Sequence, residues 1–120
     1  MNKMQALNNF WNSFGIPAYD ENTVPDDATL PYITYSASED DFGRPVSLRA
    51  SIWYRSKSWN DITAKMDEIS DHITRGGIMV KYDNGAIWIT KGSPFAQRMN
   101  DSEDDSIRRI FMNIEAEFIS

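Results

Sequence analysis

The sequence predicts an α+β domain in which an antiparallel or mixed β-sheet of about five strands is flanked by two helices, in the order α-β-β-α-β-β-β. Three observations predict this class. Residues 46–55 alternate between apolar and polar side chains, and the three-and-four spacing of a helix follows almost at once. Further runs of period two come before and after, several of them joined by short turns. The length of 120 residues suits a single domain, 1–120, with one core.

The N-terminal third is expected to contain a helix, a loop and a short strand. Residues 2–14 predict a short amphipathic helix, because their apolar side chains recur at helical spacing: Met4, Leu7, Phe10, Trp11 and Phe14. Gly15 and Pro17 end it. Residues 15–31 contain three prolines and scattered acids, which indicates a long surface loop. The strand at 32–37 is expected to pair antiparallel with residues 46–55.

The central strand has two contrasting faces. One face carries Val46, Leu48, Ala50, Ile52 and Tyr54, and the other carries Ser47, Arg49, Ser51, Trp53 and Arg55. The helix that follows has one apolar stripe, formed by Trp59, Ile62, Met66, Ile69 and Ile73. Ser58 is its expected N-cap, and Gly76-Gly77 supply the expected left-handed C-cap.

The C-terminal part is expected to hold three strands. Residues 78–83 and 86–90 predict a hairpin whose turn is Asn84-Gly85, so that Tyr82 lies opposite Ile87. Residues 91–106 contain glycine, proline and a cluster of acids, which indicates a second long loop. Residues 107–119 alternate along a long half-buried strand, expected to be central or to pair with residues 46–55.

The composition argues against several classes of function for this chain. The chain has no cysteine, which excludes disulfides and thiol chemistry and suits assembly in a reducing cytoplasm. A net charge of −6 argues against general nucleic-acid binding, since phosphate neutralisation needs a basic face. No apolar run is long enough to span a bilayer, and we expect no membrane association.

The sequence offers little catalytic chemistry. His72 is the only histidine and lies off the apolar stripe, and no Gly-x-Ser-x-Gly elbow or phosphate-binding glycine loop occurs. The acids at 101–105 lack the central glycine and the distant glutamate of an EF-hand loop. We therefore expect no enzyme activity, no cofactor and no metal.

One face of the predicted sheet carries unusually large side chains for a surface exposed to water: Arg49, Trp53, Arg55, Trp88, Arg109 and Phe111. Two interpretations remain open. The face contacts another subunit, or the N-terminal helix covers it.

Two stretches resemble a known family. Tyr32-Ile33-Thr34-Tyr35 and the run Val46 to Trp59 look like the P-Y-I-T-Y … L-x-A-S-I-W-x-R-S-x-S-W pattern of small tail-completion proteins of long-tailed bacteriophages and prophages. The segments 86–95 and 107–114 are similar to the same group. The resemblance covers nearly the whole chain from Pro31 onward.

The resemblance implies a tail terminator, which assembles as a ring, usually of six copies, caps the tail tube, and joins it to the head connector. Its implied partners are its own copies, the tail tube protein and a head-completion protein, in the neck or tail of a virion assembled in the bacterial cytoplasm. DNA would pass through without specific binding. The alternatives are another neck or head-completion protein, and a small monomeric binding module or enzyme.

A ring needs two different surface patches that meet head to tail. The residues expected at subunit contacts are Arg49, Trp53, Arg55, Trp59, Trp88 and Arg109. Asp101, Glu103, Asp104 and Asp105 are expected in a mobile or lumen-facing loop, where a negative wall would repel phosphates. Trp59 also opens the apolar stripe, which favours a core position for it over Trp53.

Overall fold

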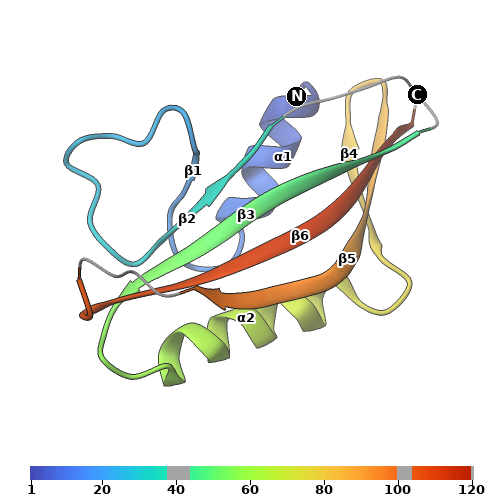
Figure 1. Cartoon of the computed structure of the whole chain (residues 1–120). Coiled ribbons are helices and arrows are strands. Elements are labelled where there is room, and N and C mark those ends of the chain that lie inside the picture. The colour runs from blue at the N-terminus through green and yellow to red at the C-terminus, as the bar shows by residue number, and fades with distance from the viewer. Residues whose placement is uncertain (38–43, 100–103, 120) are drawn as a thin grey trace.

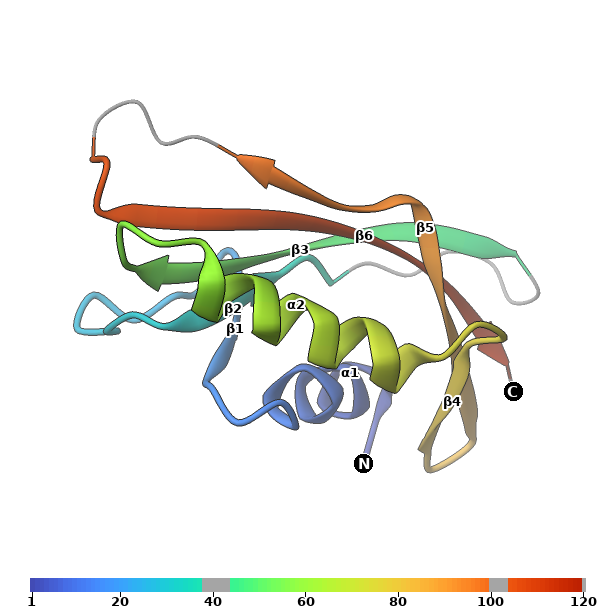
Figure 2. The ribbon, with the colours of Figure 1, turned by 90° about the horizontal axis from the view of Figure 1, so that it is seen from below.

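The computed structural model describes residues 1–37, 44–99 and 104–119, which contain two helices and one six-stranded sheet. The strand order is β1-β2-β3-β6-β5-β4, and the sheet is mixed because β1 runs parallel to β2. Both helices lie on the same face of the sheet (Figure 1 and Figure 2). The predicted α+β class is therefore correct, with one strand more than expected. The elements are α1 (Lys3–Asn12), β1 (Ala18–Asp20), β2 (Tyr32–Tyr35), β3 (Pro45–Arg55), α2 (Asn60–Ile73), β4 (Ile78–Tyr82), β5 (Gly85–Met99) and β6 (Ile107–Ile119).

The long strands β3 and β6 form the centre of the sheet. They pair antiparallel from Pro45 opposite Glu117 to Arg55 opposite Ile107, so that Trp53 lies opposite Arg109. Strand β6 is thus both central and paired with β3, the two possibilities that the sequence leaves open. Most even-numbered side chains of both strands, such as Leu48 and Met112, face the helices and are buried, whereas Val46, Tyr54 and Arg108 on the same side are partly buried. The odd-numbered side chains consequently share the opposite surface, which we call the outer face.

Helix α1 packs against the inner face of the sheet, which is the face opposite the outer one. Its N-terminus has a capping box between Asn2 and Gln5, and its buried side chains include Leu7 and Trp11. Trp11 stacks on Tyr35 of β2 with 6.3 Å between the ring centroids. The alternative in which the N-terminal helix covers the polar face is therefore wrong.

Helix α2 begins and ends differently from the prediction. Trp59 occupies the N-cap without a side-chain capping bond, whereas Ser58 Oγ accepts a hydrogen bond of 3.1 Å from the Asn60 amide. At the C-terminus Thr74 adopts the positive φ, and its hydroxyl donates to the Gly77 carbonyl at 3.0 Å. That hydrogen bond stabilises the turn after α2. Thr74, a β-branched residue, can therefore occupy a left-handed position where glycine is usual.

Strand β1 lies inside the stretch predicted to be a loop. It pairs with β2 from Ala18 opposite Ile33 to Asp20 opposite Tyr35. The Asn12 side chain accepts from the Ala18 amide at 3.0 Å and donates to the Ala18 carbonyl at 3.2 Å. These two bonds satisfy backbone groups of an edge strand, which would otherwise be open to pairing with another chain.

Strand β5 continues through much of the second predicted loop. It extends to Met99 and stays paired with β6, with a register shift between Lys91 and Ala96. Gly92 lies within this irregular stretch, where an added Cβ would approach the Asn113 Cβ to 2.9 Å. Gly92 and Pro94, which indicated a loop, lie in a β-bulge instead. The bulge bends the strand without ending it.

The β4–β5 hairpin has a register two residues away from the predicted one. Tyr82 lies opposite Gly85, so the turn is Asp83-Asn84 and the predicted pairing of Tyr82 with Ile87 is wrong. Gly85 is required for space, because a Cβ there would lie 1.9 Å from the Ile119 carbonyl oxygen. A shift of two keeps every side chain on its predicted face.

Candidate functional site

The middle of the outer face holds an arginine stacked on aromatic rings. The Arg109 guanidinium carbon lies 4.6 Å from the Trp53 ring centroid and 5.8 Å from that of Phe111. Arg109 Nε donates to the Ser51 hydroxyl at 3.0 Å, and Trp53 Nε1 donates to Thr34 Oγ1 at 2.9 Å. These bonds fix both side chains, so the outer face presents a preformed surface of cationic and aromatic groups.

Two further arginines flank this cluster, and each meets a carboxylate. Arg49 pairs with Glu21 at 2.5 Å, and Arg55 lies 3.7 Å from Asp104. Exposed ion pairs contribute only about 0.2–1 kcal/mol, so these contacts orient the arginines more than they stabilise the fold. The structure thus gathers Arg49, Trp53, Arg55 and Arg109 on one surface, as the sequence predicts.

Beside Trp53 the surface is hollowed. A pocket of about 430 Å³ lies between the strand residues Trp53 and Arg55 and the segment that precedes β2. Its remaining lining comes from Tyr32, Ile107 and the stretch 28–30. The loop before β2 therefore forms a wall of the aromatic surface.

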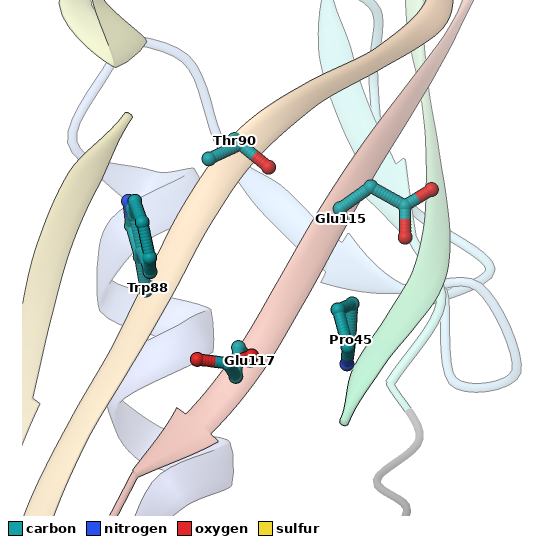
Figure 3. Close-up of a pocket in the computed structure, with 5 residues that line it drawn as sticks. All are labelled: Pro45, Trp88, Thr90, Glu115 and Glu117. Atoms are coloured by element: carbon teal, nitrogen blue, oxygen red, sulfur yellow. The ribbon is translucent and has the colours of Figure 1, made fainter. Parts of the chain in front are cut away.

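A second pocket lies at the other end of the same face, around Trp88. It has a volume of about 270 Å³ and is lined from three strands by Pro45, Trp88, Thr90, Glu115 and Glu117 (Figure 3). The register places Trp88 and Pro45 directly opposite Glu117 on its two sides. Glu115 accepts a hydrogen bond of 2.8 Å from the Ser47 hydroxyl, whereas Glu117 has no ion-pair partner among the described residues.

The structure separates Trp59 from the other predicted contact residues. Trp59 lies on the helix side, half-buried against the core, as its place in the apolar stripe favours. The guanidinium carbons of Arg98 and Arg108 lie over its ring, 4.9 Å and 5.3 Å from the centroid. The Arg108 guanidinium donates hydrogen bonds to two backbone carbonyl oxygens, that of Lys57 at 2.7 Å and that of Asp105 at 2.6 Å. Arg98 is exposed.

Of the predicted acidic loop, Asp101 and Glu103 lie outside the described residues. Asp104 accepts hydrogen bonds from the Ser106 amide at 2.8 Å and hydroxyl at 2.6 Å, which forms a tight turn before β6. Those bonds, and more weakly the charge of Arg55, hold the pKa of Asp104 below its ordinary value of 3.8. Asp105 is exposed beside it.

His72 and the metal-binding residue types can be located in the part of the chain that the structure describes. His72 is exposed on α2, where its ring meets Phe14 edge-on at 5.2 Å. Within 1–37, 44–99 and 104–119, no cluster of three or more histidine, aspartate or glutamate side chains has the arrangement of a metal site. The helices of this part are too short or too polar to cross a membrane.

No sequence pattern points to four charged residues of these surfaces: Glu115, Glu117, Arg98 and Arg108. Alternation along β6 places both glutamates on the same face as Arg109, but only the register brings Trp88 beside Glu117. Arg98 falls in the stretch predicted to be a loop, so nothing in its local sequence joins it to Trp59.

Comparisons with protein-family models and with curated proteins find no match. Among solved structures, the chain is similar to a chain of the virion of a native gene transfer agent particle, with a TM-score of 0.62. The likeness covers 98% of this chain and 91% of that chain at 17% sequence identity. At that identity the likeness is one of fold, and it extends over nearly the full length of both chains.

Proposed function

We propose that this chain is a structural protein of a bacteriophage virion, and within that class a tail terminator whose ring caps the tail tube and joins it to the head connector. The observation that carries the proposal is the likeness of fold to a virion chain, which leaves little of either chain unmatched. The resemblance of residues 31–114 to tail-completion proteins is an independent indication of the same class.

The outer face supports a role in assembly. No helix of the described chain covers it, and it carries two tryptophans, several arginines and two hollows. Aromatic and arginine side chains are enriched where proteins contact one another, and an uncovered surface of this kind is typical of an interaction site. Subunits of a ring would use such surfaces for contacts with each other.

The charge of the chain suits a DNA channel. With a net charge of −6, a ring of these chains would repel a passing duplex and avoid retaining it. We place Asp104 and Asp105 at the lumen. The tail tube protein and the head-completion protein would bind the two rims of the ring.

The first experiment measures the oligomeric state of the purified chain. Native mass spectrometry and negative-stain electron microscopy over a concentration series are expected to show rings of one stoichiometry, six copies being the expected number. A chain that remains monomeric throughout, and that turns over or tightly binds a small molecule, would instead be a binding module or enzyme.

A second experiment separates a tail terminator from a head-completion protein. Deleting the gene from its phage or prophage and inducing it should give overlong tails if the chain ends tail growth. Tails of normal length beside filled, unjoined heads would assign it to head completion.

A further inference from the structure

The pocket beside Trp88 has the composition of a receptor for a guanidinium group. Glu117 lies between the Trp88 indole and Pro45, and Glu115 is one position along the same strand face. Trp88 is 42% exposed, and Glu117 meets no cation in the described chain. Arginine binds both components of such a site, since it pairs with carboxylates and stacks on aromatic rings.

The arginines around Trp59 lack carboxylate partners, just as Glu117 lacks a cationic one. Arg98 and Arg108 bring two positive charges over one indole, and neither has a carboxylate within ion-pair distance among the residues described. Like charges held close together repel, and an approaching carboxylate relieves that repulsion. Because backbone carbonyls fix Arg108, the site is also largely preorganised.

The two sites occupy opposite ends and opposite surfaces of the molecule. Arg108 and Glu117 are nine residues apart on β6, which corresponds to about 30 Å along a strand. The longest dimension of the chain is 44 Å, and β6 runs along it (Figure 1). Arg98 pairs with Ile110 and so belongs to the helix side, whereas Glu117 belongs to the outer face.

We propose that neighbouring copies of this chain meet head to tail, with Arg98 of one copy entering the pocket formed by Trp88, Glu115 and Glu117 of the next. This inference rests on the proposed ring and names its contact. Two different patches that complement each other make a heterologous interface, which closes into a ring when the rotation between copies permits. The same chain supplies both charges, so every copy in the ring has equivalent neighbours.

Charge reversal tests the contact. Glu117→Arg and Arg98→Glu are each expected to raise the concentration for half-assembly at least tenfold, because each places like charges in contact. The double variant restores an opposite pair within one sequence and should form rings again. An equal mixture of the single variants should form rings in which they alternate, detectable by mass spectrometry. Asp67→Arg and Asp71→Arg, at exposed positions of α2 outside both sites, should assemble like the unmodified chain.

The outcomes separate this inference from the proposed function. If the unmodified chain forms no rings, the proposed function fails. If it forms rings and both reversals assemble like the controls, the ring stands and this contact is wrong. Single variants that fail to assemble and are rescued neither by mixing nor in the double variant would also overturn the pairing. Circular dichroism of each variant checks that it is folded.

Discussion

Replacing Trp53 by alanine is expected to weaken assembly while the isolated chain stays folded. Trp53 is half-buried on the outer face, where it stacks with Arg109 and donates to Thr34. Truncating a fully buried tryptophan costs about 3–5 kcal/mol, so a smaller loss is expected for the isolated chain, because Trp53 is only partly buried. A domain with a stability of about 5–15 kcal/mol remains folded after such a loss.

The effect on assembly should be comparable to that of an interface hot spot. Truncating such a residue costs about 2 kcal/mol or more of binding free energy, which raises the concentration for half-assembly about 30-fold. Ile52→Ala is the matched control, because Ile52 is the adjacent residue of β3, fully buried on the inner face. It should lower the free energy of unfolding by about 2–5 kcal/mol and change assembly less than about threefold.

Both quantities are measurable on the same samples. Urea unfolding followed by circular dichroism, at a concentration below assembly, gives the free energy of unfolding, and light scattering gives the assembly midpoint. The reasoning would be refuted if Trp53→Ala unfolded the chain, which would make Trp53 a core residue. It would also be refuted if Trp53→Ala assembled as well as the unmodified chain.

Two further predictions concern the hairpin and the turn before β6. Gly85→Ala should destabilise the chain by about 1–3 kcal/mol because its Cβ collides with the Ile119 carbonyl, whereas Gly76→Ala, with nothing within 4 Å, should be almost neutral in urea unfolding. The pKa of Asp104, measured by NMR, should lie below 3.8 and rise in Ser106→Ala. Because the folded pKa is lowered, the contribution of Asp104 to stability is present above pH 3.8 and is lost as the pH falls through the folded pKa.

The sequence predicts those features that depend on local backbone geometry. Alternation along 46–55 and 107–119 assigns every side chain of β3 and β6 to its face, because successive residues of a strand point in opposite directions. The grouping of Trp53 and Arg109 follows from that alternation and from pairing residues 46–55 with residues 107–119. Both helices follow from apolar spacing in the same way.

Features that depend on neighbouring strands were not predictable. The three residues of β1 have no recognisable pattern and are a strand only because β2 and Asn12 pair with them. Residues 91–99 look like a loop, but β6 keeps them extended across a bulge. The predicted hairpin register is wrong because the Asn-Gly pattern places Gly85 in the turn, whereas the close approach of the Ile119 carbonyl at the end of β6 is what requires a glycine there.

By itself, the sequence determined the α+β class, the inner and outer faces of the central strands, and the arginine and tryptophan residues of the outer face. Only the tertiary structure decided that both helices share one side, that Trp59 meets Arg98, and that Trp88 meets Glu117. The physical reason is that strand pairing brings together residues far apart in the chain, and its register is set by space and packing that no local pattern encodes.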